Sequence, residues 1–300
     1  MKRLFLTVLC IIVIFIILAC PEMVTDGVRQ GIKLNLYSVI PSLLPFMVLT
    51  NIMIKYNLCE YISYLFKPIL SKVFKVSSIG CFTVIIGFTC GYPMGAKVIG
   101  DLYKNRILSL SEASYLITFC NNCSITFLLN YILFNCLGSD IPLHIVLILV
   151  YVPPIMTGII NKFILKPDLN TNTSRKYILG NSNPIFSAVK SISILSVYII
   201  CFTVISEWIS SISFLPGTVK CMIAGFTEIT SGANLIATKL GNTSMRDFLI
   251  LACTVFGGFS IMFQSFEQLP DKTLKKYYLI GKAEQLTLYC VCSFIINYNK

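Results

Sequence analysis

Long apolar stretches follow one another along almost the whole chain. A helix that spans a membrane needs roughly 20 mostly apolar residues. Such stretches lie at residues 4–20, 34–54, 112–137, 141–165, 184–209, 246–268 and 277–297. The pattern predicts an all-α polytopic membrane protein with about seven transmembrane helices.

Two further apolar stretches, 76–105 and 212–242, are interrupted in the middle by small and polar residues. The first contains GFTCGYPMGAK and the second AGFTEITSGA. About 30 residues folded at a central turn give two half-helices, each about 18 Å long, which end inside a hydrocarbon core about 30 Å thick. Glycine lets the chain reverse, and proline begins the second half-helix without losing a hydrogen bond. We therefore expect two re-entrant helical hairpins.

The positive charges favour hairpins over two additional crossings. With the amino terminus inside, the hairpin topology keeps most of the 24 lysines and arginines in the cytoplasm. Nine crossings would instead export the loop that contains Lys162, Lys166, Arg175 and Lys176. The net charge of +11 is thus a property of membrane topology, and we expect lipid contacts and no nucleic-acid partner.

Composition supports the membrane assignment and argues against catalysis. The chain is 56% hydrophobic and 12% charged, with a mean hydropathy of +0.80, which is too apolar for a soluble protein of this size. Its cysteines are scattered, and Cys120 and Cys123 have no second pair or histidine nearby, so we expect no metal and no cofactor. With one histidine and no phosphate-binding motif, we expect no enzymatic activity.

The parts of the chain repeat in the same order. Gly87-Phe88-Thr89 matches Gly225-Phe226-Thr227, and Ser124 matches Ser260 at a nearly equal separation along the chain. A single crossing between the halves would invert the second copy. We expect an N-terminal transmembrane anchor and external loop (1–33), a first repeat (34–137), a connecting helix and cytoplasmic loop (138–183), a second, inverted repeat (184–268) and a C-terminal transmembrane helix (269–300). The anchor can also be interpreted as a cleaved signal, because Leu18-Ala19-Cys20 is similar to a lipoprotein cleavage site.

Inverted repeats with broken helices are typical of secondary transporters, which bind solute where the breaks meet. Broken backbone in hydrocarbon persists only where it lines a polar cavity or packs against protein. Free N–H groups and the positive ends of half-helices favour an anionic solute, with a proton or sodium as coupling ion. The expected substrate-binding residues are Thr89, Gly91, Tyr92, Asn121, Asn122, Ser124, Thr227, Glu228, Thr230, Ser231, Asn234 and Ser260.

Several of these residues allow a second interpretation. Asn121 and Asn122 can instead form hydrogen bonds between helices. Glu228 can exchange a proton or form a salt bridge with Lys97, which otherwise extends toward the cytoplasm. Glu112 is expected to be structural, because an acid in a first helical turn is stabilised by the helix dipole.

Three stretches, GFTCGYPMGAK, SEASYLITFCNNCS and AGFTEITSGA, resemble the sporulation integral membrane protein YlbJ (SpoVV) family. That family belongs to a wider group with a nucleoside-recognition (gate) domain and is similar in plan to concentrative nucleoside transporters. The chain departs from the family pattern at Cys123 and Ile125, where prolines are expected. The resemblance implies transport of dipicolinic acid from the mother cell across the outer forespore membrane. A nucleoside transporter and a non-transporting sporulation membrane scaffold are the alternatives, and a homo-oligomer is possible.

Overall fold

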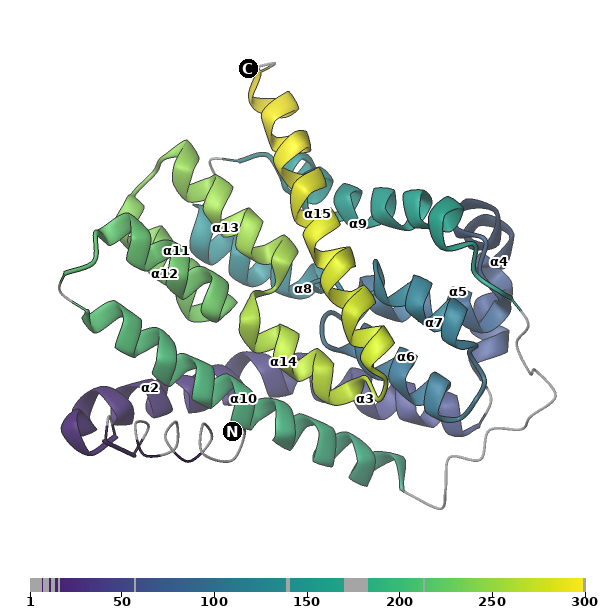
Figure 1. Ribbon diagram of the computed structural model, residues 1–300, viewed down its shortest axis with the longest axis horizontal. Coiled ribbons are helices and arrows are strands. Elements are labelled where there is room, and N and C mark those ends of the chain that lie inside the picture. The colour runs from purple at the N-terminus through teal and green to yellow at the C-terminus, as the bar shows by residue number, and fades with distance from the viewer. Residues whose placement is uncertain are drawn as a thin grey trace.

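The computed structural model describes residues 17–56, 58–138, 141–169, 183–212 and 214–298, and before them only residues 7, 11, 14 and 15. Every regular element within these ranges is a helix (Figure 1), which confirms the all-α class. Most of the expected first span and the loop residues Arg175 and Lys176 lie outside the described residues.

Five helical segments are long and apolar enough to cross a membrane, and they establish a polytopic membrane protein. A sixth results if the pair Tyr61–Phe74 and Ser78–Thr89, bent by 91°, is counted as one. The expected single span 112–137 is divided, because α7 (Leu110–Ile117) ends early and the chain resumes at α8 (Ile125–Phe127) and the π-helix η2 (Leu128–Leu137). The five segments are Pro21–Lys55, Leu143–Leu165, Pro184–Ser211, Ser244–Gln268 and Lys272–Ile296.

The segment before residue 34, which was expected to be an external loop, is helical: α2 (Pro21–Leu34) continues through the π-helix η1 (Asn35–Val39) into α3 (Ile40–Lys55), and its external location stays a prediction. Gly27 and Gly31 explain why this polar segment is ordered. A Cβ at either position would lie within 3 Å of a Cα atom of α10 (Pro184–Ser211), so the two backbones touch. Such small-residue contacts allow close helix packing in membranes.

Helix α4 (Cys59–Phe74) also lies where a loop was expected. Its lysines, Lys67 and Lys72, suggested a cytoplasmic connection, but the helix has a regular apolar side. Tyr61, Tyr64, Leu65 and Ile69 are all more than 60% exposed on it, so this side is available to lipid. The chain then turns sharply at residues 75–77 into α5 (Ser78–Thr89).

Both interrupted stretches form pairs of short helices, as expected from their central turns. The first pair is α5 and α6 (Met94–Lys104), and the second is α11 (Gly217–Thr227) and α12 (Ile229–Leu240). Their lengths of 11 or 12 residues match the expected half-helices. Whether the hairpins re-enter a bilayer remains a prediction.

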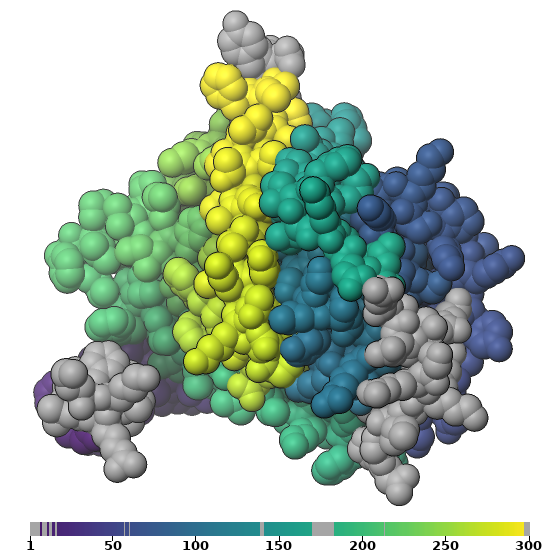
Figure 2. Space-filling model, turned by 45° about the vertical axis from the view of Figure 1, so that its right-hand side comes forward, coloured from purple at the N-terminus to yellow at the C-terminus, as the bar shows by residue number. Residues whose placement is uncertain are grey.

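The same order of elements occurs twice, once on each side of a C-terminal helix. A long helix, a short-helix pair and a broken helix occur as α3, α5–α6 and α7–η2, and again as α10, α11–α12 and α13 (Ser244–Phe256) with α14 (Gly258–Gln268). Figure 2 shows α15 (Lys272–Tyr298), in yellow, between the green second half and the teal and blue first half. The long helix α9 (Leu143–Leu165) packs beside α15.

Candidate solute-binding site

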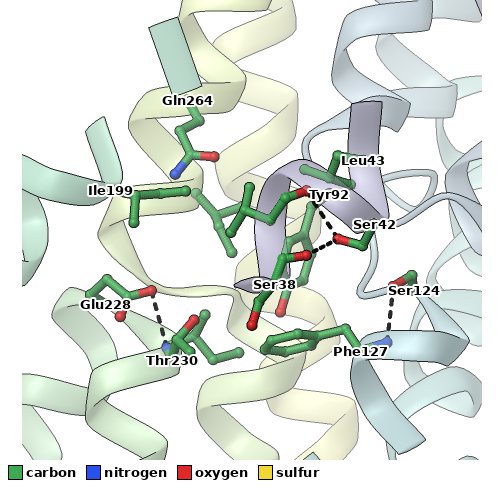
Figure 3. Close-up of a pocket in the computed structure, with 14 residues that line it drawn as sticks. Ser38, Ser42, Leu43, Tyr92, Ser124, Phe127, Ile199, Glu228, Thr230 and Gln264 are labelled. Carbon is green, nitrogen blue, oxygen red and sulfur yellow. Dashed lines mark hydrogen bonds between the residues drawn. The ribbon is translucent and has the colours of Figure 1, made fainter. Parts of the chain in front are cut away.

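A pocket lies where the broken elements of both halves meet (Figure 3). It has about 600 Å³ of empty space, a figure that includes the part open to solvent. Gly91 and Tyr92 come from the turn of the first hairpin, Glu228 and Thr230 from the second, and Ser124 from the break after α7. These five expected residues are therefore brought together.

The first hairpin reaches the pocket because its glycines pack directly on the broken helix. Gly91 has φ +85°, and a Cβ on it would lie 2.9 Å from the backbone nitrogen of Ser124. Added Cβ atoms on Gly87 and Gly95 would collide with the carbonyl oxygen of Cys120. Only glycine allows this approach, so the hairpin turn and the break are held together as one unit.

Tyr92 presents an unsatisfied hydroxyl at the pocket. The residue is 9% exposed, and its hydroxyl finds no hydrogen-bond partner in the described part of the chain. The ring lies 6.5 Å from that of Phe127 in an edge-to-face arrangement, and a Cβ added to Gly257, at the break between α13 and α14, would lie 3.6 Å from it. A buried hydroxyl normally has a partner, so this one is available to a bound solute.

Glu228 lies at the turn of the second hairpin, where it caps α12. Its carboxylate accepts hydrogen bonds from the backbone nitrogens of Thr230 (3.0 Å) and Ser231 (2.7 Å) and from the Ser231 hydroxyl (2.9 Å). The expectation that these N–H groups are free for an anion is wrong, because the protein's own carboxylate occupies them. The alternative salt bridge to Lys97 is also wrong, since Lys97 is buried and pairs with Asp101 at 2.7 Å.

The sequence analysis missed the part of the pocket that η1 and α3 contribute. Ser38, in η1, and Ser42 line it, and the Ser42 hydroxyl donates to the Ser38 carbonyl at 2.6 Å. Pro41 and Pro45 cannot donate backbone hydrogen bonds, which favours an irregular helix here. Two prolines beside two serines in an apolar stretch could have indicated that this helix is irregular and contributes to a polar site.

The second broken helix contributes Gln264, which was also missed. Its amide nitrogen donates to the Ser260 hydroxyl at 3.0 Å, and Figure 3 shows the amide beside the pocket. Ser260 itself is buried as the acceptor of this bond, so it supports the pocket without lining it.

Asn121 forms hydrogen bonds to neighbouring helices, as the alternative interpretation expected, whereas Asn122 forms a local one. The Asn121 oxygen accepts from the backbone nitrogen of Ala96 (3.2 Å), and its nitrogen donates to Ser265 (3.0 Å), which joins the break to α6 and α14. The Asn122 nitrogen donates to the carbonyl of Phe119 at 2.8 Å. Neither amide lines the pocket.

The other expected residues lie near the turns but outside the pocket lining. The hydroxyls of Thr89 and Thr227 donate to carbonyls in the preceding turn of their own helices. Ser231 is engaged by Glu228, and Asn234 is exposed on a different surface hollow. Glu112 is structural as expected, since it lies in the first turn of α7 and accepts from the Ser77 nitrogen at 2.8 Å.

The fold and the pocket define a polytopic helical membrane protein with a partly polar pocket at its chain breaks. The family model described as the nucleoside-recognition gate matches residues 36–214, more than half of the chain, so the chain belongs to this family. The match ends before the second hairpin, which supplies Glu228 and Thr230.

The chain is also similar to the sporulation integral membrane protein YlbJ of Bacillus subtilis (strain 168). The two are 28% identical over 112 residues, which cover 37% of this chain and 28% of the relative. The matched stretch thus spans less than a third of the relative's length. No solved structure matches the chain.

Proposed function

We propose that this protein is a secondary-type membrane transporter for a small planar solute and has no enzymatic activity. The observation that carries the proposal is that both hairpin turns and both broken helices border one pocket, whose mostly apolar lining includes a few polar groups. An unpaired N–H or C=O in hydrocarbon is costly, so such breaks persist only where they line a cavity or are packed by protein. Here the breaks are packed by glycines and asparagine and leave one pocket between them.

The lining suits a flat solute with several hydrogen-bonding groups. Several hydroxyls and one amide line the pocket beside aliphatic side chains, and the edge-to-face rings of Tyr92 and Phe127 form an aromatic wall. We propose dipicolinic acid as the cargo, moved from the mother cell across the outer forespore membrane. The similarity to a sporulation membrane protein and the resemblance of the hairpin motifs support this assignment.

A nucleoside is the second candidate, and Glu228 favours it. None of the described lining residues is a lysine or arginine, whereas Glu228 brings a carboxylate. A carboxylate accepts hydrogen bonds from the hydroxyls of a ribose but repels a dianion. The negative charge of Glu228 is therefore expected to lower the affinity for dipicolinate and to raise the affinity for a nucleoside.

The test is uptake of labelled dipicolinate and of labelled uridine into vesicles that contain the purified chain, for wild type and Glu228→Gln. If dipicolinate is the cargo, removing the negative charge should preserve or raise its affinity. If uridine is the cargo, the same change should lower affinity several-fold, since a charged acceptor is lost. Glu22→Gln, on the exposed start of α2, is the matched control and should change neither.

A membrane scaffold is the outcome if neither solute is bound or taken up by any variant. In a spore-forming cell, loss of a dipicolinate carrier should leave dipicolinate synthesis intact while spores contain little of it and lose heat resistance. Normal spore dipicolinate after deletion would reject this cargo and leave the transporter proposal to the vesicle assay.

A further inference from the structure

A lysine is buried at the junction of the two halves of the molecule. Lys282 lies inside α15 and is 3% exposed. Its ammonium donates to the carbonyl of Val255 at 3.0 Å and to the side-chain oxygen of Gln285 at 3.1 Å. It forms no ion pair with any carboxylate of the described residues.

Gln285 extends this contact to the other half. Its side-chain nitrogen donates to the carbonyl of Thr118 at 2.7 Å, and it is 1% exposed. The neighbouring Gly281 allows the approach, because a Cβ there would collide with the Thr118 backbone. Lys282 and Gln285 therefore connect one carbonyl of each broken helix.

The two carbonyls occupy equivalent positions in the repeat. Thr118 follows the last residue of α7, and Val255 is the next-to-last residue of α13. Their separation along the chain falls between the two nearly equal separations of the repeated motifs. Both are at the C-terminal ends of half-helices, where the dipole is negative and carbonyls lack helical partners.

The ammonium also adjoins the pocket. Its nitrogen lies 6.0 Å from the centre of the Tyr92 ring, within range of a cation–π contact, and Tyr92 lines the pocket. Lys282 is thus separated from the solute site by a single aromatic ring.

Unwound carbonyls and the C-terminal ends of half-helices are the groups that coordinate coupling cations in transporters with discontinuous helices. We propose that the Lys282 ammonium is a built-in cation that takes the place of such an ion, so that solute transport by this chain needs no sodium. The proposal rests on the transport function proposed above and specifies its ion dependence.

The first experiment compares wild-type vesicles in sodium, potassium and choline chloride at equal ionic strength. We expect uptake of the transported solute, dipicolinate or uridine, to agree within about two-fold in the three salts. The melting temperature of the solute-free protein should also be the same in each. Uptake or melting temperature that rises specifically with sodium overturns the inference while leaving the transporter proposal standing.

The second experiment uses Lys282→Ala, with Lys276→Ala on the exposed side of the same helix as control. Removing buried, charge-assisted hydrogen bonds should lower the melting temperature by about 5 °C or more. The space left by the lysine faces the carbonyl oxygen of Val255. Sodium, but not choline, should therefore raise the melting temperature of Lys282→Ala. If Lys282 is only structural, Lys282→Ala should lower the melting temperature but sodium should not restore it. That result would overturn the inference.

The melting temperatures test the role of Lys282 independently of whether the protein transports a solute. If no solute is taken up in any salt, the transporter proposal fails, and the melting temperatures still decide the role of Lys282. If Lys282→Ala does not fold, the wild-type salt comparison remains the test.

Discussion

Replacing Tyr92 by phenylalanine removes one hydroxyl and keeps the ring that packs beside Phe127 and Lys282. Because the hydroxyl is buried without a partner in the described chain, its removal should leave the free energy of unfolding unchanged or raise it by up to about 1 kcal/mol. A solute that bonds to this hydroxyl should lose about 0.5–1.5 kcal/mol of binding free energy, which is a loss of roughly 2- to 12-fold in affinity.

Tyr115→Phe is the matched comparison. Tyr115 is fully buried, and its hydroxyl lies 2.8 Å from the carbonyl of Phe74 and 2.9 Å from that of Gly158. The same atom removed here should cost about 1–3 kcal/mol of stability, because two buried carbonyls lose their donor. Solute affinity should be unaffected, since Tyr115 does not line the pocket.

The assay pairs unfolding in detergent with equilibrium binding of labelled dipicolinate and uridine. Tyr92→Phe should lose affinity for the solute and keep its stability. Tyr115→Phe should lose stability and keep its affinity. Equal destabilisation by both variants, or unchanged affinity in Tyr92→Phe for a solute that wild type binds, would refute the assignment of Tyr92 to the site.

Three further changes test the packing and the topology. Gly31→Leu should lower the free energy of unfolding by about 1–3 kcal/mol, because a Cβ there would lie 2.8 Å from a Cα of α10; Ile32→Leu, at the exposed neighbour, should not. Glu112→Ala should cost about 1–3 kcal/mol by leaving a backbone N–H before α5 without its acceptor, whereas Glu112→Gln, which keeps an acceptor, should cost less in the same unfolding assay. Single cysteines at Lys72 and Lys104 should react with impermeant reagents from the same side of the membrane, and labelling from opposite sides would contradict a re-entrant first hairpin.

The hairpins could be predicted because local chemistry determines them. Gly91 has a backbone conformation that favours glycine, and Glu228 is a side chain that can cap the helix that follows it. Both residues therefore indicate a turn inside an apolar stretch, and both line the pocket. The long apolar helices follow in the same way from length and hydropathy alone.

The remaining site residues depend on tertiary contacts that a sequence does not display. An asparagine in an apolar stretch looks the same whether it faces a cavity or, like Asn121, bonds to a neighbouring backbone nitrogen. Lys282 illustrates the same limit for charge. Its position well inside a helix was a signal for burial, but only the packing of α15 against both halves shows what the ammonium contacts.

The continuous helix formed by α2, η1 and α3 is longer than a bilayer is thick. Its 35 residues extend for about 52 Å at 1.5 Å per residue, against a hydrocarbon core of about 30 Å. To fit inside that core it would have to tilt by more than about 50°, beyond the range of about 0–40° seen for membrane helices. We therefore expect the polar end, where the Gln30 amide donates to Glu207 of α10 at 2.7 Å, to lie outside the hydrocarbon core. We expect this end of the two packed helices to lie within reach of antibodies or cross-linking reagents that never enter the lipid.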